Sequence, residues 1–205
     1  MIAIIDYGVG NLFSLKSSFR ALGAEIAVSA DPEVIEKADK LILPGVGAFG
    51  DAAEKLRRDG MDKLVRSQAE KGKPLLGICL GMQLLFEESL EYGRHEGLGL
   101  LPGSVVPIAD AIPEGLKIPH IGWNALHFPK ERAVSPLFQH IKENDCVYFV
   151  HSFYATNCGE SVIATAEYGA ELTAAAARGN VFGVQFHPEK SGEVGLNILR
   201  AFCEL

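Results

Sequence analysis

The first half of the chain alternates short aliphatic runs with amphipathic segments. The run "IAIIDY" (residues 2–7) is typical of a strand, and in residues 11–23 apolar side chains recur at helical spacing until a glycine ends the pattern. The alternation continues in strand-like residues 25–31, 40–45 and 73–79 and in helix-like residues 32–39 and 48–72, the last interrupted near Gly60. Because the strands are almost continuously aliphatic, we expect a parallel sheet covered by helices on both faces and joined by right-handed crossovers.

After about Gly97 the segments become shorter and are separated by turn residues. The strand-like segments are residues 103–109, 124–128, 146–153, 161–168, 172–179 and 180–186, and residues 192–205 have the apolar spacing of a closing helix. We interpret the short segments as hairpins that extend the sheet, with room for a small antiparallel layer. The predicted fold class is α/β: an open, mostly parallel twisted sheet flanked by helices, flavodoxin-like, with additional antiparallel strands in the C-terminal half.

Length and composition fit a single domain spanning residues 1–205. Apolar residues make up 48% of the chain and charged residues 22%, so we expect a full hydrophobic core and little disorder. A net charge of -7 without any basic cluster argues against nucleic-acid binding. No segment reaches the roughly 20 apolar residues of a membrane span, and the first residues have no leader pattern. We therefore expect a cytoplasmic protein.

Four cysteines, Cys79, Cys146, Cys158 and Cys203, are scattered along the chain. Their spacing suits neither a zinc site nor a dense disulfide framework, and we expect no metal and no cofactor. Three of them are predicted to be ordinary thiols of a reducing compartment. Cys79 differs because it lies in "LLGICLGMQLLF", with a glycine two residues away on each side.

Residues 77–81 match the nucleophile elbow, a sharp strand-to-helix turn, with cysteine where other hydrolases carry serine. Gly77 and Gly81 would lack side chains because the strand and helix backbones converge there. The helix that begins after Cys79 would favour the thiolate, and the N–H of Leu80 would face an oxygen that develops charge when the sulfur attacks a carbonyl. The alternative is a buried structural cysteine beside two packing glycines.

His187 is the histidine best placed to activate such a thiol, since an ordinary thiol pKa is about 8.5. It ends a strand-like segment that Pro188 prevents from continuing, and Glu189 follows two residues later. If this strand neighbours the strand before Cys79, the imidazole reaches the thiol and Glu189 orients the ring. Three other histidines lack such neighbours and are interpreted as ordinary: His95, His127 and His140.

Two further glycine-rich turns follow predicted strands. In "LPGVGAF", backbone N–H groups of residues 44–47 could join that of Leu80 in an oxyanion site, or the segment is a plain strand-to-helix turn. In "DYGVGN", Gly8 and Gly10 hint at a dinucleotide loop, but Phe13 occupies the third glycine position. A tight turn is the better interpretation there.

The segments "PGVGAF", "GICLGMQLLF" and "FHPEKS", in this order, resemble the triad-type (class I) glutamine amidotransferases. "DYGVGN", "PHIGWN" and "YFVHSF" narrow the resemblance to the glutaminase subunits of imidazole glycerol phosphate synthase, over essentially the whole chain. The resemblance implies hydrolysis of glutamine to glutamate and delivery of ammonia to a cyclase that makes imidazole glycerol phosphate and AICAR in histidine biosynthesis.

The resemblance also assigns roles by position. Cys79 would be the nucleophile, His187 the general base and acid, and Glu189 the orienting carboxylate. Backbone groups at Gly47 and Leu80 would hold the oxyanion, with Val46 in the same segment. The positions that match the family's glutamine-binding residues are Gln83, Glu91, Ser152 and Phe153, the last a tyrosine in many relatives.

A partner is implied as well: a (β/α)8-barrel cyclase subunit, in a heterodimer that keeps ammonia away from solvent. The positions expected at the interface are Asn11, Trp123, Tyr148 and Lys190, whose alternative interpretation is solvated loop polarity and one core tryptophan. Because a freely running glutaminase would waste glutamine, we expect the isolated chain to be nearly inactive. Reorientation of residues 44–47 is the predicted control.

Other functions remain open from the sequence. One is a glutaminase that feeds anthranilate, pyridoxal phosphate or guanylate synthesis, against which "PHIGWN" weighs. Another is a free peptidase or γ-glutamyl hydrolase with the same triad. The non-enzymatic alternative is a flavodoxin-like interaction domain in which Cys79 is inert.

Overall fold

The computed structural model describes residues 1–205, and a seven-stranded sheet lies at its centre, in the order β11-β12-β13-β4-β3-β1-β2. The parallel strands are β1 (Ile2–Ile5), β2 (Ile26–Ser29), β3 (Lys40–Leu43), β4 (Leu75–Ile78) and β13 (Val181–Val184). Two antiparallel strands, β12 (Glu171–Arg178) and β11 (Val162–Glu167), continue the sheet beyond β13. The predicted α/β fold with a mostly parallel sheet is confirmed.

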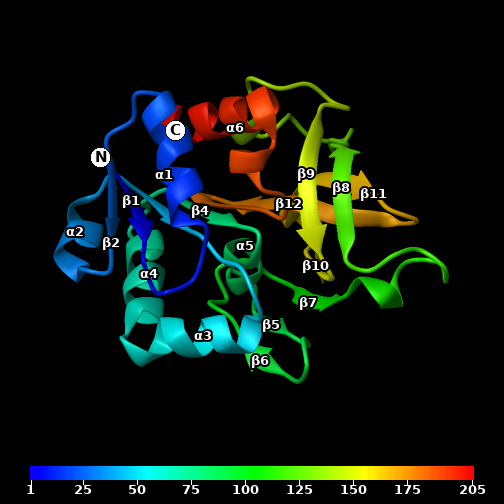
Figure 1. The fold of residues 1–205 in the computed structure, drawn as a ribbon, viewed down its shortest axis with the longest axis horizontal. Helices are drawn as coiled ribbons and strands as arrows, with labels where there is room; N and C mark the ends of the chain where they lie inside the picture. Colours follow the sequence, from blue (N-terminus) through cyan, green and yellow to red (C-terminus); the bar gives the residue numbers. More distant parts are fainter.

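Helices cover both faces of this sheet (Figure 1). On one face lie α1 (Leu12–Ala21) and α6 (Gly192–Glu204), and on the other lie α2 (Pro32–Lys37), α3 (Phe49–Arg58), α4 (Met61–Glu70) and α5 (Leu80–Leu84). Neighbouring strand residues such as Ile4 and Ile5 therefore enter different cores, and both are fully buried. This explains why the strands read as continuous aliphatic runs.

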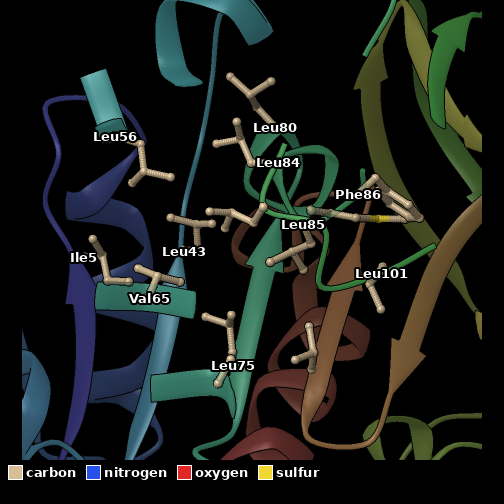
Figure 2. Close-up of a cluster of buried hydrophobic side chains, with 14 of the residues drawn as sticks. Ile5, Leu43, Leu56, Val65, Leu75, Leu80, Leu84, Leu85, Phe86 and Leu101 are labelled. Atoms are coloured by element: carbon tan, nitrogen blue, oxygen red, sulfur yellow. The ribbon is translucent and has the colours of Figure 1, made fainter. Parts of the chain in front are cut away.

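Figure 2 shows the core beneath α3, α4 and α5, where Leu56 and Val65 approach Leu43 and Leu75 of the sheet. The long helical segment is interrupted at Gly60, as predicted. Gly60 has a φ of 71°, in the left-handed region that glycine adopts without strain.

The strands after residue 87 do not all extend the central sheet. β5 (Glu88–Ser89), β6 (His95–Glu96), β7 (Ser104–Pro107) and β10 (Phe153–Thr156) form a second sheet, and β8 (His120–Ala125) pairs only with β9 (Cys146–His151). The predicted extension of the sheet by hairpins therefore applies to β11–β13 alone. In place of one small antiparallel layer there are two separate sheets, of which the four-stranded one contains the parallel pair β5–β7. The strand expected over residues 146–153 breaks at Ser152 because its two halves belong to different sheets.

Four short 3₁₀ helices complete the fold: η1 (Ile108–Asp110), η2 (Pro136–Phe138), η3 (Gly159–Ser161) and η4 (Pro188–Lys190). None of the helices combines the length and apolar content needed to cross a bilayer. The order β13-β4-β3 brings the carboxyl ends of three parallel strands to one edge, so the residues that follow them gather at the same place.

Candidate active site

Cys79 lies on a strained turn between β4 and α5. Its φ of 55° and ψ of -113° are values that residues other than glycine rarely adopt. A Cβ on Gly77 would lie 2.6 Å from the carbonyl oxygen of Gly81, and one on Gly81 would lie 1.9 Å from that of Leu43. The predicted elbow is present, with one correction: Gly81 makes room for the neighbouring strand β3 and not for β4.

The helix after Cys79 is shorter than the expected dipole effect requires. α5 has five residues, so its macrodipole contributes little. The N–H of Leu80 remains without an intrahelical acceptor because Leu80 is the first residue of the helix. Stabilisation of the sulfur must therefore come mainly from individual hydrogen-bond donors.

His187 follows β13, which pairs in parallel with β4, and its ring reaches Cys79. The Nδ1 atom lies 2.9 Å from Oε1 of Glu189, and only 4% and 1% of these two side chains are exposed. Burial alone would lower the pKa of His187. The interactions with Cys79 and Glu189 outweigh burial and raise the pKa to about 10. The second carboxylate oxygen, Oε2, has no hydrogen-bond partner. This environment favours an imidazolium between sulfur and carboxylate.

The backbone around His187 is tied to strand β9. The N–H of His187 donates to the carbonyl of Tyr148 at 2.9 Å, and Ser191 Oγ donates to the carbonyl of His187 at 2.7 Å. The same hydroxyl accepts from the N–H of Tyr148 at 2.9 Å. A displacement of β9 would therefore move the imidazole.

The predicted oxyanion segment, residues 44–47, lies directly against the elbow. A Cβ on Gly45 would lie 2.7 Å from the backbone nitrogen of Gly81, so glycine permits this approach. Val46 and Gly47 line the same cavity as Cys79 and Leu80, and Gly47 has a φ of 95°.

Tyr7 supports this segment and was not predicted from the sequence. Its hydroxyl donates to the carbonyl of Pro44 at 2.7 Å, and burial, followed by the nearby Cys79, raises the pKa of Tyr7. Gly10, with a φ of 122°, packs where a Cβ would lie 2.9 Å from that of Pro44. The segment "DYGVGN" is therefore a tight turn, as predicted, that supports the neighbouring one. The contact between Tyr7 and Pro44 could have been expected only from the adjacency of β1, which precedes Tyr7, and β3, which precedes Pro44.

The cavity above Cys79 has a volume of about 330 Å³. Its lining brings together all four residues predicted to bind glutamine, Gln83, Glu91, Ser152 and Phe153. The N–H of Phe49, at the start of α3, donates to Oε2 of Glu91 at 2.7 Å. Burial raises the pKa of Glu91, and this hydrogen bond opposes the rise. The site thus offers a nucleophile, a base, backbone donors and a carboxylate around one space.

Two buried histidines that the sequence interpretation left out support the far wall of the cavity. The carbonyl of Phe153 accepts from Gln83 Nε2 at 3.2 Å and from His151 Nδ1 at 2.8 Å. His151 Nε2 lies 3.0 Å from Nδ1 of His120, its cross-strand partner in β8, and Nε2 of His120 lies 2.8 Å from Oδ1 of Asn124. Burial lowers the pKa of His120 and lowers that of His151 to about 4. Only the register of β8 against β9 would have revealed the pair.

Three of the four predicted interface residues form one cluster. Trp123 and Tyr148 are cross-strand partners in β8 and β9 with ring centroids 6.1 Å apart, and Lys190 Nζ lies 5.9 Å from the Tyr148 ring centroid. Asn11 instead caps α1 by accepting from the N–H of Ser14 at 3.4 Å, and α1 contacts η4, which carries Lys190. Trp123 is 55% exposed, so the alternative of a core tryptophan is wrong.

The other cysteines and the acidic side chains form no second site. Cys146 is exposed, Cys203 is half-buried and Cys158 is buried, and burial raises the pKa of the last two. No group of three or more histidine, cysteine, aspartate or glutamate side chains is arranged to hold a metal ion.

Comparison with solved structures identifies the fold. A structure described as "Crystal structure of glutamine amidotransferase" superposes with a TM-score of 0.77 at 23% identity, covering 100% of this chain and 98% of that one. PurLQS from Thermotoga maritima gives a TM-score of 0.77 at 21% identity, with 99% and 97% covered. At these identities the similarity concerns the fold alone.

Sequence comparison goes further. Residues 3–204 match the family described as "Glutamine amidotransferase class-I". The imidazole glycerol phosphate synthase subunit HisH of Bacillus velezensis is 50% identical, over 100% of this chain and 96% of that protein, and HisH of Methanothermobacter thermautotrophicus is 48% identical, over 100% and 98%. The chain therefore belongs to the class-I glutamine amidotransferase family and, within it, to the HisH glutaminase subunits of imidazole glycerol phosphate synthase, which serve histidine biosynthesis.

Proposed function

We propose that Cys79, His187 and Glu189 hydrolyse glutamine and that the ammonia passes to a (β/α)8-barrel cyclase subunit. The observation that carries this proposal is that Cys79, on a strained elbow, and His187, held 2.9 Å from Oε1 of Glu189, line the same cavity of about 330 Å³. A buried structural cysteine needs neither the imidazolium nor the strained backbone.

The chemistry follows from the placement of these groups. The sulfur of Cys79 attacks the side-chain carbonyl carbon of glutamine, and the resulting oxyanion lies near the N–H groups of Leu80 and Gly47. His187 gives its proton to the departing ammonia, which leaves a thioester on the sulfur. Water then attacks the thioester while His187 takes its proton, and the C–S bond breaks to release glutamate and thiolate. Glu189 holds the ring in position throughout.

The amino-acid end of the substrate would lie at the opposite side of the cavity. Because Nε2 of Gln83 faces the carbonyl of Phe153, its Oε1 is left to accept a hydrogen bond from the substrate ammonium group. Glu91, held by the N–H of Phe49, would pair with the same ammonium. Both groups line the cavity, which supports their assignment to the substrate.

The cyclase would dock on the face that carries Asn11, Trp123, Tyr148 and Lys190. Two exposed apolar residues on the same elements, Phe13 and Ile121, would extend this face. Since the carbonyl of Tyr148 holds the N–H of His187, docking on β9 would reach the base directly. This supports the expectation that the isolated chain is nearly inactive. We also treat residues 1–205 as one domain and place it in the cytoplasm, where its four free cysteines would remain reduced.

Replacement of the nucleophile tests the proposal. Cys79→Ala should lower glutamine hydrolysis by the complex at least ~10³-fold, because no other group can form the thioester. Synthesis from added ammonia should be unchanged, since the cyclase reaction does not use the thiol. Cys146→Ala, at an exposed thiol, is the matched control and should retain both activities. Glutamine hydrolysis that survives Cys79→Ala would contradict the mechanism, and loss of both activities would indicate a docking defect.

Partner dependence is tested by assaying glutamine hydrolysis with and without the cyclase and its ribonucleotide ligand. We expect the isolated chain to be far slower than the complete complex. Equal rates would contradict the proposed coupling while leaving the triad in place.

A further inference from the structure

Gln185 is a fully buried side chain for which the proposed mechanism gives no role. It follows β13, two residues before His187, and lies between Gln83 and Cys79. Its Oε1 is 3.0 Å from Nε2 of Gln83, and its Nε2 is 3.8 Å from the sulfur of Cys79. A polar side chain without solvent contact therefore touches the reacting atom.

The orientation of this amide is fixed by a backbone carbonyl. The carbonyl of Phe153 only accepts hydrogen bonds, so the atom of Gln83 that faces it at 3.2 Å must be the NH₂ group. The same NH₂ group faces Gln185, whose atom at that position must be the oxygen. The NH₂ group of Gln185 is then left to point at the sulfur. Rotation of either amide would set two donors or two acceptors against each other.

A hydrogen-bond donor directed at the sulfur stabilises it mainly when the sulfur carries a negative charge. A neutral thiol is a weak acceptor, whereas a thiolate gains from each N–H that points at it. The interaction is therefore strongest when the sulfur is negative: before it attacks, and again when the C–S bond of the thioester breaks and the electron pair returns to sulfur. The geometry supplies such a donor from Gln185, in addition to the imidazolium of His187, which lines the same cavity as Cys79.

We propose that Gln185 is a catalytic residue of this glutaminase, which stabilises the Cys79 thiolate through its amide NH₂ and holds Gln83 in the orientation that accepts the substrate ammonium. The inference rests on the proposed function. It adds a thiolate donor to the triad and couples the nucleophile to the substrate-binding side of the cavity.

Two substitutions test the proposal. Gln185→Met keeps a similar volume without the donor, and Gln185→Glu keeps the shape but replaces the donor by a carboxylate oxygen. Alkylation of Cys79 by iodoacetamide, followed by mass spectrometry of the full chain across pH, should show a midpoint about one pH unit higher in both variants. At pH values well below the wild-type midpoint, the alkylation rate should then fall about tenfold. In the complex with the cyclase, kcat for glutamine should fall about tenfold or more.

Gln68, a buried glutamine on α4 that is outside the cavity, provides the matched control. Gln68→Met should leave both the alkylation profile and kcat unchanged. Alkylation profiles of both Gln185 variants that coincide with the wild type would overturn the proposal. A higher KM with an unchanged profile would also overturn it, since Gln185 would then act through Gln83 alone.

A failure to fold and a failure of the proposed function can each be distinguished from a failure of this inference. If Gln185→Met does not fold, as judged by thermal unfolding, the isosteric Gln185→Glu decides the question. If the wild-type complex hydrolysed no glutamine, the proposed function would fail, whereas a shifted alkylation profile would still establish the contact between Gln185 and the sulfur.

Discussion

Two glycine-rich segments meet at the candidate active site and differ in how tightly they are held. At the elbow, a Cβ on Gly77 or Gly81 would lie 2.6 or 1.9 Å from backbone oxygen atoms. At Gly47, with a φ of 95°, a Cβ would meet nothing within 4 Å. Packing therefore fixes the elbow and the start of the oxyanion segment, while Gly47, at the end of that segment, is held mainly by its own backbone conformation. The contrast suits a site whose thiol is preorganised and whose oxyanion donors can be switched.

The surroundings of the two segments explain the contrast. The elbow lies at the end of the central strand β4, between β3 and β13. Residues 44–47 cross the edge of the sheet and are held there by Tyr7 and by the close approach of Gly45 to Gly81. Substitutions at the two places should therefore have effects of different size and kind.

The largest effect is expected at Gly81. Gly81→Ala would place a Cβ 1.9 Å from the carbonyl oxygen of Leu43, so β3 and α5 must separate. We expect the free energy of unfolding, measured by urea denaturation, to fall by at least about 3 kcal/mol. Gly72→Ala, where φ is 88° and no atom lies within 4 Å, is the control and should cost about 1 kcal/mol of backbone strain. Equal losses would show that the elbow is not constrained by packing.

The next largest effect is expected at the far wall of the cavity, where acid should lower the stability of the folded chain through His151. Burial lowers the pKa of His151 from 6.5 to about 4, so below pH 6.5 the unfolded chain binds a proton that the folded chain does not. The free energy of unfolding should therefore fall as pH drops from 6.5 to 4, by up to about 3 kcal/mol. The raised pKa of His187 affects stability in a different pH range. Its contribution to the free energy of unfolding is fully present below pH 6.5 and is lost as the pH rises towards 10.

The variant His151→Gln isolates this contribution. It should be less stable than the wild type at pH 7, yet its unfolding free energy should change less between pH 6.5 and 4. Parallel pH profiles of the two proteins would exclude His151 as the group responsible.

The smallest effect on stability is expected at Gly47. Gly47→Ala meets no steric clash and should cost about 1 kcal/mol in urea denaturation, from the left-handed backbone alone. Glutamine hydrolysis by the complex should nevertheless fall about tenfold or more, because a Cβ restricts rotation of the segment that carries the oxyanion donors. Unchanged activity would show that residues 44–47 need no such freedom.

Local sequence patterns predicted the parallel half of the fold and the elbow. Aliphatic runs, helical spacing and glycine positions are short-range signals, and the parallel sheet follows from their alternation. The placement of His187 beside Cys79 also followed, because carboxyl ends of parallel strands share one edge.

The antiparallel half was not predictable to the same degree. Whether β8 and β9 join the central sheet depends on contacts far apart in sequence, and so does the pairing of His120 with His151. Gln185 looked like one more strand residue, because its significance appears only when the amide of Gln83 is seen opposite it. Tyr7 was missed for the same reason, since its acceptor belongs to a different strand-to-helix turn.

The position of β13 between β4 and β12 has a consequence for biosynthesis. On the ribosome, the thiol is made long before the imidazole, and the strand that brings them together is the last one of the chain. A nascent or truncated polypeptide that ends before β13 carries a nucleophile without its base. If Cys79 and His187 act as proposed, such a polypeptide should hydrolyse no glutamine.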